Sequence, residues 1–141
     1  MRDSFLVRCS LAVILSFGPS AVFAVCTGAD RAGNFRVYGL FGAEQVAAPN
    51  AFTRCLFRIG PTGAVLAGSS CTDNTNAVET VTGTITLSTS CLVTANLTVG
   101  GFPVRIVQGQ MSRDKEHISG VGRFTFPGVG TAVFLFSAIR I

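Results

Sequence analysis

Cysteine is the residue type in this chain whose number and spacing carry the clearest chemistry. Four of the five cysteines lie beyond residue 24, at Cys26, Cys55, Cys71 and Cys91. An even set in an oxidising compartment forms disulfides by default, and the spacings contain no CxxC pair of the kind that binds zinc. Four cysteines allow three pairings. We favour Cys55–Cys71, which flank a predicted turn at 60–63, and then Cys26–Cys91.

The titratable residues form no convincing catalytic constellation. His117 is the single histidine and follows a charged turn at 113–116, where an exposed position is expected. Neighbouring Glu116 points to the opposite face of the same strand, so it cannot orient the imidazole ring. The remaining acids fall mostly in predicted turns and form no carboxylate pair. We therefore predict no catalytic residue, no metal site and no cofactor, and we lean against an enzyme.

Arginine is the commonest charged residue, and it raises the question of anion binding. An arginine inside a barrel can hold a carboxylate through two parallel hydrogen bonds. Strand alternation places most of these arginines opposite the apolar set and therefore in solvent. Arg54 and Arg58 are less clear, because they share a face with Phe52 and Leu56. These two arginines are our candidate ligand-binding pair.

The first 24 residues predict the compartment in which the cysteines and the other side chains function. They combine two early arginines, an apolar run and small residues ending at Ala24, which predicts a cleavable signal peptide and a secreted or periplasmic protein. Gly18-Pro19 interrupts the run, which argues against a transmembrane anchor. Val25 stands where a lipobox needs Gly or Ala, which argues against lipidation. Residues 25–141 have the length of one domain.

Charge excludes one class of partner. Beyond residue 24, nine basic and six acidic side chains remain, without a run of Lys or Arg. Nucleic-acid binding proteins carry a clustered basic patch. No nucleic-acid partner is therefore expected.

The elements that must position these residues are short β-rich runs separated by Gly, Pro, Asn, Asp and Ser. Residues 42–50 are the one place where a helical turn fits, because Ala, Glu and Gln favour helix. The predicted strands are 34–41, 52–60, 64–70, 78–88, 91–99, 102–111, 117–126 and 131–140.

Short connections between these strands predict an all-β, antiparallel up-and-down meander. Threonines alternate with apolar residues along 80–87, and Gly100-Gly101 makes a two-residue hairpin turn. Eight strands of this kind close into a barrel, which removes the sheet edges; a β-sandwich is the runner-up. Membrane insertion is not expected, because transmembrane barrels carry aromatic girdles and this chain has no Trp and one Tyr.

The last predicted strand, 131–140, is apolar on both faces. One face would fill the barrel, and the other must be covered by the 42–50 segment or by a partner, including a second copy of the chain. The twelve phenylalanines fit either a Phe-rich core or a greasy ligand cavity.

Two segments carry a resemblance. Cys55–Cys71 (CLFRIGPTGAVLAGSSC) and Val81–Val99 (VTGTITLSTSCLVTANLTV) resemble the hairpins of a loose group of exported bacterial β-proteins. The resemblance implies an antiparallel, lipocalin-like barrel and assigns no functional residue. Lipocalins carry a GxW motif near the first strand, whereas this chain has Gly33-Asn34-Phe35.

Three functional hypotheses follow. The first is a secreted barrel that binds a small apolar or amphipathic ligand. The second is a structural or interaction module that uses its apolar C-terminal strand. The third is a small-barrel enzyme of the cyclase type, which would act by shaping a reactive substrate.

Overall fold

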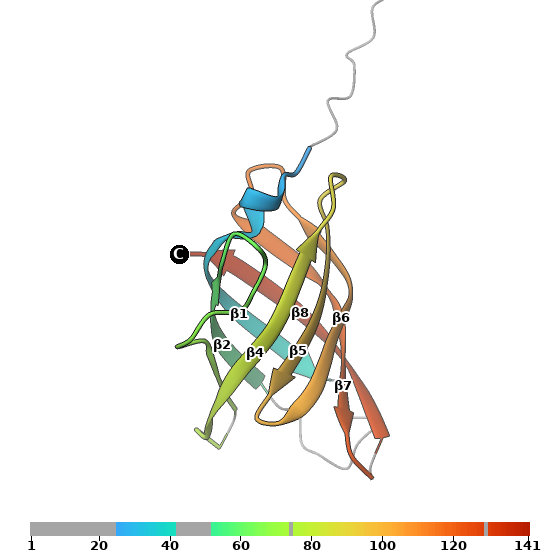
Figure 1. The fold of residues 1–141 in the computed structure, drawn as a ribbon. Coiled ribbons are helices and arrows are strands. Elements are labelled where there is room, and N and C mark those ends of the chain that lie inside the picture. The colour runs from blue at the N-terminus through green and yellow to red at the C-terminus, as the bar shows by residue number, and fades with distance from the viewer. Residues whose placement is uncertain (1–24, 42–51, 74, 129) are drawn as a thin grey trace, which may run out of the picture.

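The computed structural model describes residues 25–41, 52–73, 75–128 and 130–141, which form one 3-10 helix and eight strands (Figure 1). The helix, η1, covers Gly28–Arg31. The strands are β1 (Gly33–Phe41), β2 (Phe52–Ile59), β3 (Ser70–Thr72), β4 (Val78–Leu87), β5 (Leu92–Val99), β6 (Phe102–Met111), β7 (His117–Phe126) and β8 (Gly130–Arg140).

Pairing between the first and last strands closes the sheet. β1 pairs with β2 on one side and with β8 on the other, so that Val37 lies opposite both Cys55 and Ala138. Consecutive strands are antiparallel neighbours around the whole ring. The structure confirms the predicted eight-stranded antiparallel up-and-down barrel and excludes the sandwich.

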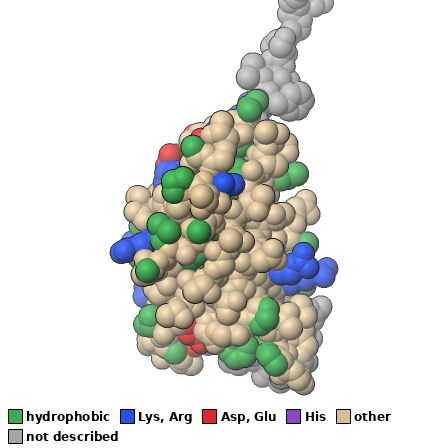
Figure 2. Space-filling view, in the orientation of Figure 1, with side chains coloured by type: hydrophobic (Ala, Val, Ile, Leu, Met, Phe, Trp, Pro, Cys, Tyr) green, Lys and Arg blue, Asp and Glu red, His purple; other side chains and the backbone are tan. Residues whose placement is uncertain are grey.

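Side-chain alternation along β4 and β5 sends apolar residues into the barrel and polar residues outward. In β5, buried Val93, Ala95 and Leu97 alternate with exposed Thr94 and Asn96. The wall formed by β4 and β5 therefore shows mostly uncharged polar side chains, as the tan surface of Figure 2 illustrates. Within the described ranges, no helix has the length and hydropathy needed to cross a bilayer.

Glycines and bulges bend the strands enough to close a small barrel. Register shifts interrupt the β5–β6 and β6–β7 ladders, the second of them between Ile106 and Gln108. Gly120 lies opposite Gly109, and a Cβ at position 120 would lie 2.1 Å from the Gln108 carbonyl oxygen. Only glycine allows β6 and β7 to approach each other this closely.

The third strand is shorter and later than predicted. We expected a strand over 64–70, whereas β3 covers three residues and the segment before it makes only isolated bridges. The chain turns at Gly63 and Gly68, whose φ angles of 87° and 84° are left-handed. Gly68 lies within the predicted range, and its left-handed conformation is incompatible with a continuous strand there.

A buried serine holds this irregular segment against β2. The Arg58 amide donates to the Ser69 hydroxyl at 2.9 Å, and that hydroxyl donates to the Leu66 carbonyl at 2.8 Å. These local side-chain bonds replace the missing part of the ladder.

Other predicted elements have mixed outcomes. The turn at Gly100-Gly101 is confirmed, with φ angles of 57° and 86°. The turn at 60–63 is also confirmed, by a bond from the Gly63 amide to the Gly60 carbonyl at 2.9 Å. The helix η1 was not predicted. The predicted signal peptide at 1–24 and the helical turn at 42–50 lie outside the described residues.

The close approach of β6 and β7 makes a testable prediction. Gly120→Ala should lower the free energy of unfolding by about 1–3 kcal/mol, because the new methyl group meets backbone atoms that cannot move aside. Chemical denaturation measures the change. Ser119→Ala, on the outer face next to it, is the control and should change stability by less than about 0.5 kcal/mol. Equal stability of the two variants would contradict the prediction.

Candidate ligand-binding cavity

A cavity of about 80 Å³ lies inside the barrel. Nineteen residues drawn from all eight strands line it, and their side chains are aliphatic, aromatic or part of a disulfide. None of these nineteen side chains carries a charge. The aromatic members are Phe35, Phe57, Phe124, Phe134 and Phe136. A guest in this space would therefore be held by burial and dispersion alone.

Glycines on β6 and β7 leave this volume open, because large rings from β8 pack in the space where a side chain would otherwise lie. The Phe134 ring takes the space over Gly122, where a Cβ would lie 2.2 Å from the ring's Cζ. The Phe136 ring lies over Gly109 in the same way, 3.2 Å from a Cβ placed there. The two rings, 6.4 Å apart between centroids, therefore pack on β6 and β7 and leave the middle of the barrel less than full.

One end of the cavity is closed by the N-terminal segment. η1 lies across the end of the barrel where β1 begins and β8 ends (Figure 1). The Cys26–Cys91 disulfide ties this segment to the β4–β5 turn, and both cysteines are buried. The Cys26 amide also donates to the Thr89 carbonyl at 3.0 Å.

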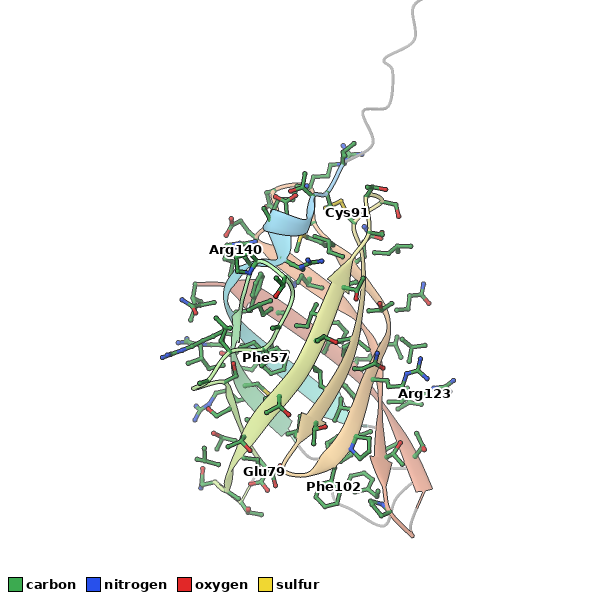
Figure 3. The ribbon with its side chains drawn as sticks, in the orientation of Figure 1. Phe57, Glu79, Cys91, Phe102, Arg123 and Arg140 are labelled. Atoms are coloured by element: carbon green, nitrogen blue, oxygen red, sulfur yellow. A yellow bond between two sulfur atoms is a disulfide. The ribbon has the colours of Figure 1, made fainter. Side chains whose placement is uncertain are left out.

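Arg140, the last residue of β8, joins the parts of this closed end (Figure 3). Its guanidinium donates to the carbonyls of Ala32 at 2.6 Å, Asp30 at 2.5 Å and Lys115 at 3.1 Å. The guanidinium carbon lies 4.8 Å from the centroid of the Phe35 ring. Since Phe35 is fully buried and lines the cavity, Arg140 covers the cavity's end through a cation–π contact.

An ion pair adds to the closure. The Lys115 ammonium lies 3.4 Å from the Asp30 carboxylate and donates to the Val25 carbonyl at 2.6 Å. The Thr27 amide donates to the same carboxylate at 2.6 Å. The hydrogen bond from the Thr27 amide, together with the contact to Lys115, holds the pKa of Asp30 below its ordinary value.

The opposite end of the cavity meets an aromatic cluster. The rings of Phe124 and Phe126 lie 4.5 Å apart, and Phe102 lies 5.8 Å and 6.1 Å from them. All three are half-buried, and Phe124 also lines the cavity. Among the described residues, this end is held by ring contacts rather than by hydrogen bonds to a charged group.

The candidate pair Arg54 and Arg58 lies on the outside of the barrel. Both residues are exposed, whereas Cys55 and Phe57, at alternate positions of β2, are buried and line the cavity. The face of β2 that carries Arg54 and Arg58 is thus the outer face. This corrects the hypothesis that the two arginines bind an anion within the barrel. The physical reason is burial: Cys55, Phe57 and Ile59 pack into the barrel, so alternation along β2 turns the two arginines outward.

Both favoured disulfides are present. Cys55 and Cys71 are direct partners in the β2–β3 ladder, and Cys26 reaches Cys91 across the closed end. All four described cysteines are therefore bonded. In the ranges that the structure covers, no group of three or more His, Cys, Asp and Glu side chains could hold a metal ion.

His117 belongs to the outer wall, as expected of a residue at a turn. Its Nε2 lies 2.8 Å from the Ser137 hydroxyl, and the side chain is exposed. It therefore cannot act on a molecule inside the barrel.

Sequence reasoning missed the role of Arg140. The signal was available, because position 140 has the same parity as the inward set Phe134, Phe136 and Ala138 in the last strand. An arginine on an inward position at a strand end is a candidate for covering a barrel. At Gly122 the structure shows a further feature that sequence reasoning missed, since the absent side chain leaves space for the Phe134 ring.

The fold and this interior define a closed, eight-stranded β-barrel with an apolar cavity. No family model matches the sequence, and no curated protein matches it. Three solved structures share the fold, each bound to DFHBI in its description. EF1p2_mFAP2b has a TM-score of 0.64 at 10% identity, covering 79% of this chain and 94% of that one. The redesigned β-barrel mFAP1 has a TM-score of 0.60 at 14% identity, over 82% and 100% of the two chains. The redesigned β-barrel mFAP0 has a TM-score of 0.58 at 13% identity, over 79% and 99%. At such identities the likeness concerns the fold alone.

Arg140 makes the second prediction. Arg140→Ala should lower the free energy of unfolding by about 2–4 kcal/mol, because three carbonyls lose a charged donor and Phe35 loses its cover. Thermal and chemical denaturation measure the loss. Arg123→Ala, on an exposed site, is the control and should cost less than about 0.5 kcal/mol. A similar loss in both variants would show that Arg140 has no special role.

Asp30 makes the third prediction, on pH. Because folding lowers the pKa of Asp30, its ionised form stabilises the fold above the unfolded value of 3.8, and this contribution disappears as the pH falls through the lower folded value. Asp30→Asn should therefore be less stable than the wild type at neutral pH, and the gap should narrow in strong acid. Melting curves across the acid range test this. A gap that does not depend on pH would contradict it.

Proposed function

We propose that this protein binds a small apolar molecule inside its barrel. The observation that carries the proposal is the cavity of about 80 Å³ whose nineteen lining residues offer no charge. Protein interiors are normally filled to crystal-like density, so residual space along the barrel axis calls for an explanation. The solved barrels that share the fold are described as bound to a small molecule, which supports the proposal weakly.

The size of the cavity limits the ligand. Drug-sized ligands occupy pockets of roughly 300–1,000 Å³, whereas an engineered apolar cavity of about 150 Å³ binds benzene. A space of about 80 Å³ therefore admits nothing larger than a single ring or a short stretch of hydrocarbon chain. If the natural ligand is amphipathic, its polar head would have to stay outside, since the lining side chains cannot neutralise a charge.

Entry at the aromatic end fits this function best. The other end is held by the Cys26–Cys91 disulfide and by the bonds of Arg140. At the aromatic end, the rings of Phe102, Phe124 and Phe126 contact one another.

A second candidate function is that of an interaction module built on β8. Its outward residues remain uncovered in the described structure, with Leu135 at 59% exposure. A cyclase-type enzyme receives less support, because the cavity lining holds no acid or base. Binding without chemistry is the function that the geometry supports best.

The setting proposed for this function is outside the cytoplasm. Two disulfides indicate an oxidising environment. A signal peptide over residues 1–24 and a secreted or periplasmic location remain part of the proposal.

The fourth prediction tests the cavity with benzene as the probe. Benzene at about ten times its dissociation constant should raise the melting temperature by about 4–6 °C, because it binds the folded state. Ala95→Leu projects a larger side chain into the cavity and should abolish the rise. Thr94→Leu, on the outer face of the same strand, should retain it. A rise that is absent in the wild type, or equal in the two variants, would contradict the proposal.

The natural ligand is best sought by native mass spectrometry of the protein isolated from the compartment where it accumulates. A small mass that co-purifies and is lost on denaturation would identify the ligand class.

A further inference from the structure

The outer surface of the barrel is divided into two unlike walls. Over β4 and β5 the outward residues are mostly threonines. β8 lies on the other side of the ring from β4 (Figure 1). Its outward positions include three large apolar residues, Val133, Leu135 and Ile139, together with Thr131 and Ser137. We call the large apolar residues of β8 and neighbouring β1 the β8 face. Its members are Tyr38, Leu40, Val133, Leu135 and Ile139, and each is more than 40% exposed.

The β8 face is continuous across neighbouring strands at Leu135, and Ser137, opposite Tyr38, separates this part from Ile139. Leu40 lies opposite Leu135 in the β1–β8 ladder, and Leu135 lies opposite Val121 in the β7–β8 ladder. Opposite residues on one face of a sheet are close enough to form one surface. Scattered apolar residues on a surface need no explanation, but a contiguous set of this kind marks an interaction site.

Arginines border this face through the same ladders. Arg36 is the register partner of Ile139, Arg54 that of Tyr38, and Arg123 that of Val133. All three arginines are exposed. In the described part of the chain, both ion pairs involve other basic residues, Lys115 and Arg140, at the closed end of the barrel. The guanidinium groups around the β8 face are therefore available to an external anion.

Arg123, one of the bordering arginines, also belongs to an arginine pair that points to an anionic partner. Arg105 and Arg123 are direct partners in the β6–β7 ladder, and both are exposed. Like charges placed opposite each other destabilise a sheet. An anion bound between the two guanidinium groups would remove this repulsion and would form charge-assisted hydrogen bonds.

We propose that the β8 face docks on the surface of an anionic phospholipid bilayer. The apolar side chains would enter the boundary between headgroups and acyl chains, and the bordering arginines would bind the phosphates. The face is the convex outer wall of a barrel, and fluid lipid adapts to such a surface. The polar wall over β4 and β5 would remain in water, so the protein would lie on the membrane and would not span it.

Other occupants fit the face less well. A second copy of the chain would bring the same arginines against each other, which opposes association. An acidic protein would satisfy the charges, but it would need a concave surface to cover a convex apolar wall. The proposal does not rest on ligand binding inside the barrel, although a membrane would be a source of apolar ligands.

The test is flotation with vesicles of equimolar phosphatidylglycerol and phosphatidylcholine, compared with vesicles of phosphatidylcholine alone. The protein is the exported form, with its N-terminus determined by mass spectrometry. We expect it to float with the anionic vesicles and to be released when NaCl rises from about 0.1 M to about 1 M, where the screening length falls to about 3 Å. Arg105→Gln with Arg123→Gln should weaken binding by roughly fivefold for each charge removed.

Two matched controls separate the β8 face from general stickiness. Leu135→Ser should weaken vesicle binding, whereas Leu92→Ser, an exposed leucine on β5, should not. Arg113→Gln, in the β6–β7 turn, removes a charge away from the face and should also leave binding unchanged. Circular dichroism checks that each variant is folded. Because all variants share one N-terminus, an effect of residues 1–24 cannot produce these differences.

Several outcomes would overturn the proposal. Equal binding to neutral and anionic vesicles would do so, as would equal effects of Leu135→Ser and Leu92→Ser. A concentration-dependent dimer that Leu135→Ser disperses, without vesicle binding, would assign the face to self-association. Binding to polyglutamate without binding to vesicles would assign it to an acidic protein. As a control, Leu135→Ser should keep the benzene response of the wild type, which would show that a loss of vesicle binding does not come from damage to the cavity.

Discussion

The pairing of β1 with β8 is the constraint on which the rest of this structure depends. Seven register pairs, from Phe35 with Arg140 to Phe41 with Phe134, join the two ends of the described chain into one ring. Without this ladder the sheet would have two open edges, and its apolar side would face water. Closure gives every strand two partners and turns that side into an interior. The last strand thereby brings Arg140 over Phe35, so the seam of the sheet and the cover of the cavity are the same contact.

Closing eight strands tightly determines how the interior is filled. Strands of a small barrel must bend and approach each other, and this structure uses glycines and bulges on β6 and β7 for that purpose. Gly122 and Gly109, on these two strands, leave space for the rings of Phe134 and Phe136. The rings lie against the wall and not across the axis, which leaves an apolar space. The cavity is therefore a consequence of how the barrel bends, and its size follows from which residues are small.

The sequence predicted the parts of this fold that depend on local chemistry. The alternation along Val81–Leu87 and the turn at Gly100-Gly101 are local signals, and both elements formed as expected. The disulfides were favoured because a turn was visible between Cys55 and Cys71. The strand predicted at 64–70 failed because β propensity there competes with turns at two glycines and with hydrogen bonds of a buried serine. Whether a short apolar segment pairs with a neighbour is decided by contacts that its own residues do not encode.

The candidate site was harder to predict because it depends on which way each strand faces. Alternation alone leaves two choices for β2, and Arg54 and Arg58 were ambiguous for that reason. Packing of the whole barrel removes the ambiguity, because Cys55 and Phe57 are buried against the other strands and the arginines at alternate positions therefore point outward. The same choice has a consequence on the outside. An arginine excluded from the interior joins the outer wall, where Arg54 lies beside Tyr38 and Arg36 beside Ile139. The orientation of the strands that keeps charged side chains out of the cavity therefore also places arginines around the apolar outer face of the last strand. The neutral interior and the basic exterior have the same cause.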